Sequence, residues 1–146
     1  MAIADRLSTV ADYINTLLNT NKVTLGLQDV FYGDQEKIPR TPAVAVETGV
    51  YTRELSGIGG KGRTDNKFTV YILVYNNRIR DEQLNRKDVL TLSEAIMDVL
   101  HSDVTMGGNV IHGHVTAIEP GYAIRQNVLM RMARITWEGL TKTIIV

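Results

Sequence analysis

The sequence contains no cysteine. This absence excludes disulfide scaffolds, cysteine-ligated zinc, iron–sulfur clusters and thiol catalysis, and it fits a reducing cytoplasm. The chain also lacks a net charge, because 16 Lys and Arg residues balance 16 Asp and Glu residues. Proteins that grip duplex nucleic acid along a whole face usually carry a clear positive excess, since phosphate neutralisation supplies most of the affinity. We therefore expect no extensive nucleic-acid-binding face, while local basic patches stay open.

Long apolar runs are also missing. The N-terminal stretch MAIADRLSTVADYINTLL is interrupted by Asp5 and Arg6, so we expect neither a signal peptide nor a membrane span. The composition is otherwise that of a globular domain, with 44% hydrophobic and 22% charged residues. A chain of 146 residues favours a single domain over residues 1–146, large enough to fold around a core without a disulfide or structural metal.

Apolar periodicity predicts helices and strands in the order α-β-β-β-α-β-β. Two amphipathic helices are expected over about Ala2–Asn19 and Asp81–His101. Alternating patterns predict strands at Val23–Phe31, Ala43–Leu55, Arg63–Tyr75, Val110–Glu119 and Val128–Gly139. The proline-containing segment Gly33–Pro42 and the stretch PGYAIRQN are expected to be loops. These elements predict an α+β fold, in which a mostly antiparallel five-stranded sheet packs against two helices.

The second and third strands are predicted to form a long β-hairpin, whose tip is SGIGGKG (residues 56–62). The tip lacks the Ser or Thr and the following helix of a phosphate-binding P-loop, so a hairpin tip is the favoured interpretation. Lys61 and Arg63, with Arg53 on the partner strand, make it basic. Such a tip could contact nucleic acid or an acidic protein surface.

Candidate chemical groups are sparse. His112 and His114 lie two residues apart on one strand and point the same way, so they could hold zinc if Glu119 or His101 supplied a third ligand. The favoured interpretation is a pair of polar surface residues, with no metal or cofactor. No GxSxG elbow accompanies the Ser, His and Asp residues, and we expect no enzymatic activity.

Three other groups of residues have simple interpretations. The loop carboxylates Asp34 and Glu36 are expected to be solvated. Met130 and Met132 are expected in the core, with a contact surface as the alternative. The start of the second helix is predicted to be laced with charge and to form salt bridges with a neighbouring subunit; its charged residues are Arg78, Arg80, Asp81, Glu82, Arg86, Lys87 and Asp88.

The arrangement resembles the tail terminator, or tail completion, proteins of long-tailed bacteriophages. The resemblance covers essentially the whole chain in element order and length, without diagnostic motif residues. Four features carry it: the N-terminal helix followed by VTLGLQDVFYGDQEKIPRTPAVAVETG; the glycine-tipped hairpin with KFTVYILVYNN; the helix DVLTLSEAIMDVLHS; and the closing pair GNVIHGHVTAIEPGY and VLMRMARITWEGLTK. Neck proteins that join head and tail are similar, so a head–tail connector or head-completion protein is the alternative.

The resemblance implies a structural protein of the virion, assembled in the host cytoplasm. Its copies would form a hexameric ring at the head-proximal end of the tail tube, stop tube polymerisation and offer a surface for head joining. The implied partners are further copies of the chain, the tail tube protein and a neck connector, with non-specific contact to passing DNA and no membrane. The residues expected to contact a subunit, the tube or DNA are Arg53, Ile58, Lys61, Arg63, Arg78 and Arg80.

Two hypotheses of another class stay open. One is a metal-binding domain that uses His112 and His114, and the other is a nucleic-acid-binding module that uses the basic hairpin tip.

Overall fold

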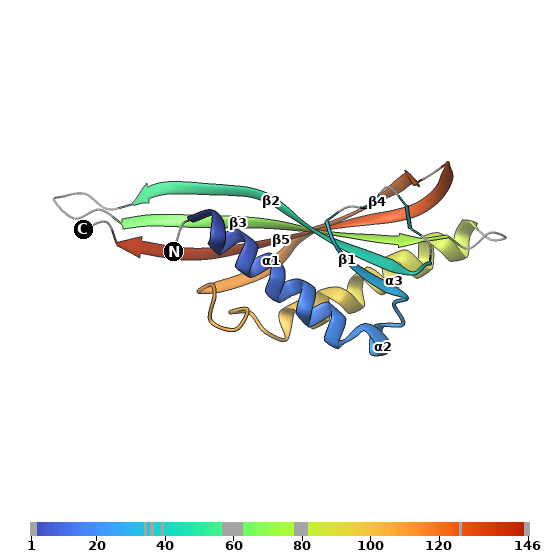
Figure 1. The fold of residues 1–146 in the computed structure, drawn as a ribbon, viewed down its shortest axis with the longest axis horizontal. Helices are drawn as coiled ribbons and strands as arrows, with labels where there is room; N and C mark the ends of the chain where they lie inside the picture. The colour runs from blue at the N-terminus through green and yellow to red at the C-terminus, as the bar shows by residue number, and fades with distance from the viewer. Residues whose placement is uncertain are drawn as a thin grey trace.

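A computed structural model describes residues 3–33, 35, 37–38, 40–56, 63–77, 82–125 and 127–144. The side chains of residues 3–6, 55–56, 63–64, 82–87 and 142–144 lie outside this description. Figure 1 shows a long twisted sheet with α1 and α3 on one side of it. The predicted α+β class is confirmed. In chain order the elements are α1 (Ile3–Thr20), α2 (Lys22–Leu25), β1 (Asp29–Tyr32), β2 (Ala43–Ser56), β3 (Arg63–Asn76), α3 (Glu82–His101), β4 (His112–Arg125) and β5 (Val128–Ile144).

The five strands form one mixed sheet in the order β1-β2-β3-β5-β4. The four long strands pair antiparallel, and the β2–β3 ladder runs out to the pair Ser56–Arg63, as expected for a long hairpin. β1 instead runs parallel to β2 and covers only Ala43–Val46. β3 lies centrally, in agreement with its apolar residues on both faces.

The larger core lies between the sheet and the two long helices. Its helical residues include Val10, Ile14 and Leu18 of α1, with Val89, Ile96 and Leu100 of α3. They pack on sheet residues that include Val44, Val46, Val70, Ile72 and Ile135. Full burial of one such aliphatic side chain contributes about 1.5–3 kcal/mol. This helix-covered face is therefore the main source of the fold's stability.

Trp137 occupies a space that two glycines provide. Its side chain is fully buried on the helix-covered face. Gly113 lies next to the indole on β4, and Gly139 is two residues further along β5. An added Cβ would lie 2.0 Å from the indole at Gly113 and 2.4 Å from it at Gly139. Both positions must therefore lack a side chain for the ring to lie flat against the sheet.

A second, smaller core covers one end of the other face of the sheet. Ile38 packs there against Ala43, Ala45, Leu73, Tyr75, Ala123 and Met130, and Met132 packs beside them. Met130 is buried and Met132 is partly buried, in keeping with the core interpretation. The remainder of this helix-free face carries mostly polar side chains.

The predicted first strand, Val23–Phe31, is wrong in its first half. Lys22–Leu25 forms the short helix α2, and only Asp29–Tyr32 is a strand. Gly26, with φ of 74°, ends α2 in the left-handed conformation, and its N–H bonds back to Lys22 and Val23. Val23 is 92% exposed, so its alternation with Leu25 and Leu27 did not mark a sheet face.

The loop predicted between the last two strands is also wrong. Residues Pro120–Arg125 of PGYAIRQN continue β4, and β5 extends beyond Gly139 to Ile144. Arg125 pairs directly with Val128, so the connection is a tight turn in which Asn127 has φ of 62°. Pro120 misled the prediction, because proline is tolerated on an edge strand such as β4.

β2 contains a β-bulge that shifts its faces. Between the pairs Thr48–Val70 and Tyr51–Phe68, β2 has one residue more than β3. Tyr51 therefore joins the helix-covered face and contacts Phe68 edge-on, whereas Val50 is 54% exposed. Simple alternation would place Val44, Val46, Thr48, Val50 and Thr52 on one face, and the bulge ends this alternation after Thr48.

Candidate interaction surfaces

The basic hairpin tip lies largely beyond the described part of the chain. Arg53 is exposed on β2, opposite Asn66, on the same side of the sheet as Phe68. Arg63 begins β3, but its side chain is not described. The other expected contact residues fall outside the described residues; they are Ile58, Lys61, Arg78 and Arg80. Asp34, Glu36 and most of the charged start of the second helix are outside as well.

His112 and His114 lie side by side and exposed on β4, with their ring centroids 6.4 Å apart. The proposed third ligands are engaged elsewhere. His101 Nε2 accepts a hydrogen bond of 3.0 Å from the backbone N–H of Val115, and Glu119 pairs with an arginine. Over the described ranges, no three His, Asp or Glu side chains are grouped so that they could hold a metal ion.

On the helix-free face, Arg134 contacts two neighbouring side chains. Arg134 donates a hydrogen bond of 2.9 Å to Glu119, and its guanidinium lies 5.0 Å from the centre of the Tyr71 ring. The hydrogen bond to Glu119 raises the pKa of Arg134, and the charge of Glu119 adds to the effect. Both charged side chains are about half exposed, at 42% and 56%, so the pair orders the surface more than it stabilises the fold.

This face carries charged side chains of both signs. Strand alternation places on it, among the described side chains, Glu47, Glu54, Asp65, Glu119 and Glu138 together with Lys67, Arg125 and Arg134.

Both edges of the antiparallel part of the sheet are open over part of their length within the described structure. Pairing of β2 with β1 stops at Val46, so Glu47–Ser56 has no strand on its outer side there. β4 is the last strand on the other side, where Gly113 and Val115 donate their N–H groups to Val104 O and His101 Nε2, so its open part follows Val115. Unpaired backbone groups on such edges are ready to pair with another chain.

The β4–β5 turn carries exposed apolar side chains, which sequence analysis missed. Ile124 and Leu129 are paired across the two strands and are 66% and 57% exposed. Tyr122 and Val128 add to them at 52% and 40% exposure. These four residues are called the turn patch below. The signal was present in the alternating segment YAIR, but the preceding PG led to the prediction of a loop.

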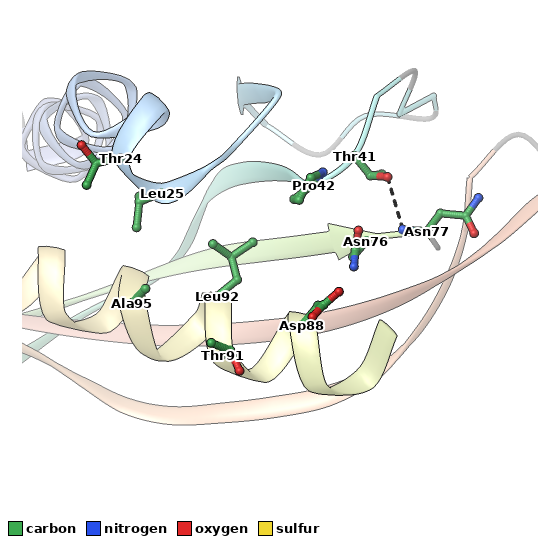
Figure 2. Close-up of a pocket in the computed structure, with 10 residues that line it drawn as sticks. All are labelled: Thr24, Leu25, Thr41, Pro42, Asn76, Asn77, Asp88, Thr91, Leu92 and Ala95. Atoms are coloured by element: carbon green, nitrogen blue, oxygen red, sulfur yellow. Dashed lines mark hydrogen bonds between the residues drawn. The ribbon is translucent and has the colours of Figure 1, made fainter. Parts of the chain in front are cut away.

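A pocket of about 490 Å³ opens between α2 and α3, beside Asn76 at the end of β3. Leu25, Pro42, Leu92 and Ala95 form its apolar lining. Figure 2 shows Leu25 reaching down from α2 and Leu92 reaching up from α3 toward the same space. The rim is polar, and on it the N–H of Asn77 donates a hydrogen bond of 3.3 Å to Thr41 Oγ1. Its residues come from four separate elements and connecting segments, so no sequence motif could mark it.

The chain matches no known family model and no curated protein sequence. No helix within the described ranges is long and apolar enough to cross a membrane.

Proposed function

We propose that this chain is a structural protein of a long-tailed phage that forms a ring at the head-proximal end of the tail tube. The ring stops tube polymerisation and presents the surface to which the filled head is joined. The work is done by binding between protein subunits, and no reaction is catalysed. The sequence resemblance to tail terminators motivates the proposal, and the open edges of the sheet are the observation that carries it.

The two open edges are suited to each other. Successive antiparallel pairings reverse direction from β2 to β3, to β5 and to β4, so β2 and β4 run in opposite directions. If the open part of β4, Ala117–Arg125, lies beside Glu47–Ser56 of the next copy, with the two sheets in the same orientation, the strands meet antiparallel. Antiparallel pairs form the more stable ladder. The contact uses two different edges, and repetition of such a contact closes a ring when the rotation permits.

In such a ring with the helices on the outside, the helix-free face lines the hole. Arg53 lies on the helix-covered side of the sheet, which favours protein contact for this residue over contact with DNA in the hole.

The test is a phage in which the gene for this chain is deleted. We expect overlong tail tubes and unjoined filled heads, measured by negative-stain electron microscopy, with both defects corrected by the chain supplied in trans. Tails of normal length with unjoined heads would instead identify a neck connector. Normal infectious particles would overturn both assignments.

Nucleic-acid binding needs a separate measurement on purified protein. DNA binding that survives moderate salt and is lost in the Arg53→Ala/Lys61→Ala/Arg63→Ala variant would favour a nucleic-acid-binding module.

A further inference from the structure

Asn76 carries a buried side-chain amide that makes no hydrogen bond within the described part of the chain. It is the last residue of β3, and it is only 8% exposed. Strand alternation directs its side chain to the helix-covered side, where it lines the pocket between α2 and α3. Figure 2 shows the amide in the space between Pro42 and Asp88. A buried amide normally has a hydrogen-bond partner, so this one points to a ligand in the pocket.

The pocket offers a second neutral hydrogen-bonding group. Thr41 Oγ1 accepts the backbone N–H of Asn77 at 3.3 Å, so the hydroxyl hydrogen of Thr41 can be donated to a ligand. Asp88 is the one ionisable residue among the described lining residues, and it already interacts with another part of the chain. The lining therefore suits a neutral ligand and not a phosphate or a carboxylate.

The interior of the pocket is aliphatic. Leu25 of α2 and Leu92 of α3 reach toward one space from opposite sides, and Pro42 and Ala95 complete the apolar lining (Figure 2). The volume of about 490 Å³ falls within the range of sites that bind small ligands. This is room for one leucine-sized side chain together with the peptide groups that flank it.

The polar and aliphatic parts of the pocket match the two parts of an amino-acid residue in an extended chain. The amide of Asn76 has one carbonyl acceptor and one NH2 donor, and a peptide group presents the complementary N–H and C=O. The aliphatic interior takes the neighbouring side chain. A flexible segment fits better than a folded surface, because side chain and peptide group must enter the pocket together. In the turn patch, by contrast, Ile124 and Leu129 are held side by side on two paired strands.

We propose that the pocket between α2 and α3 binds an extended segment of a partner protein. An aliphatic side chain of the segment lies between Leu25 and Leu92, and one of its peptide groups bonds to the amide of Asn76. The site goes beyond the proposed ring, because none of its described lining residues belongs to the open edges Glu47–Ser56 and Ala117–Arg125. It gives the chain a contact for a second kind of protein in addition to its own copies.

The probe is N-acetyl-leucinamide, a capped leucine that has two amide groups and no charge. Added to isotope-labelled protein, it should shift the side-chain amide signal of Asn76 in NMR spectra, with a dissociation constant on the order of millimolar for so small a ligand. N-acetyl-glycinamide lacks the aliphatic side chain and should bind at least about tenfold more weakly. Asn76→Ala should weaken the binding of N-acetyl-leucinamide by about tenfold as well, because the hydrogen bonds to the amide are lost.

A second variant fills the pocket and leaves Asn76 in place. Ala95→Leu extends a larger side chain into the pocket from α3 and should abolish binding of the probe. Glu94→Leu is the matched control, because it adds the same residue at an exposed position of α3 outside the lining; it should bind as the wild type does. Equal binding by the two variants, or no binding by the wild type at any soluble concentration of probe, would overturn the proposal.

Self-association distinguishes a partner protein from a second copy of the chain. Ala95→Leu should associate as the wild type does, measured by light scattering after gel filtration. Loss of self-association in Ala95→Leu but not in Glu94→Leu would place another copy in the pocket and overturn the assignment to a partner. The deletion phenotype tests the terminator role independently, so a failure of one proposal is distinguishable from a failure of the other.

Discussion

The hydroxyl of Tyr13 donates a hydrogen bond of 2.5 Å to Oδ2 of Asp103, a residue 90 positions away. The same carboxylate oxygen accepts the backbone N–H of Gly107 at 3.1 Å. Gly107 has φ of +68°, and a Cβ there would lie 2.7 Å from the ring of Tyr13. The hydrogen bond of Tyr13 thus links α1 to the segment that follows α3. The bond lowers the pKa of Asp103, and Asp103 raises the pKa of Tyr13.

Tyr13→Phe should be less stable than the wild type, by an amount that depends on pH. The depressed pKa of Asp103 contributes stability above its ordinary value of 3.8, and this is lost as pH falls through the lowered value. The raised pKa of Tyr13 contributes stability below 10.0, and this is lost as pH rises through the raised value. Urea denaturation measured across pH should show that the free energy of unfolding of the wild type exceeds that of Tyr13→Phe by a constant amount between these two pH limits. Below the lower limit and above the upper limit, this difference should shrink. In an Asp103→Asn background, Tyr13→Phe should lower the free energy of unfolding by less than it does in the wild type. An equal decrease in both backgrounds would contradict a coupling between Tyr13 and Asp103.

Gly113→Ala should destabilise the fold by about 1–3 kcal/mol, the usual cost of overfilling a packed core. The added methyl group would overlap the indole of Trp137, which the sheet and helices confine on all sides. Gly121→Ala is the matched control on the same strand, because nothing lies within 4 Å of a Cβ there. Thermal or urea unfolding measures both, and equal stability of the two variants would refute the packing argument.

Val50→Lys should weaken self-association and leave the melting temperature within about 1–2 °C. Val50 is 54% exposed at the bulge of β2, and a lysine on an open edge opposes pairing with another strand. Val23→Lys carries the same charge on α2, where Val23 is 92% exposed, and should associate as the wild type does. Light scattering after gel filtration gives the comparison. Unchanged association of Val50→Lys would argue against pairing through this edge.

A chelator should change neither the melting temperature nor the self-association of the protein, and metal analysis should find no stoichiometric zinc. The reason is geometric, since His112 and His114 lack a third ligand among the described residues. His112→Ala/His114→Ala should behave as the wild type does. Bound zinc that this double variant loses would revive the metal-binding hypothesis.

Much of the fold was predictable because its hydrophobic pattern is strong. Ile14 and Ile96 belong to helical stripes that are buried as expected, and Val70 and Ile72 lie in a predicted strand that the structure places at the centre of the sheet. The secondary-structure predictions failed where the folded environment of a segment overrode its local sequence pattern. Val23 and Leu25 alternate like a strand, yet Gly26 closes them into a helical turn. The edge position of β4 tolerates Pro120, so a proline that signals a loop elsewhere does not end this strand.

The candidate surfaces were less predictable than the fold. The basic residues chosen from sequence lie mostly outside the described residues, and their roles stay predictions. The pocket combines Leu25 and Leu92 with residues at the ends of β2 and β3, a juxtaposition that only the folded chain creates. The exposure of Ile124 was not predictable either, because isoleucine is usually buried in folded proteins and only the structure shows that nothing covers it at the end of the hairpin.

Trp137, the single tryptophan of the chain, is fully buried in the core on β5, one strand in from the edge strand β4. Its intrinsic fluorescence should therefore report the integrity of the packed interior and remain silent when copies associate. Emission that shifts to longer wavelength signals solvent entry and loss of fold, whereas a change in particle size at constant emission signals assembly. The molecule thus contains an optical probe with which the two processes can be followed separately in one cuvette.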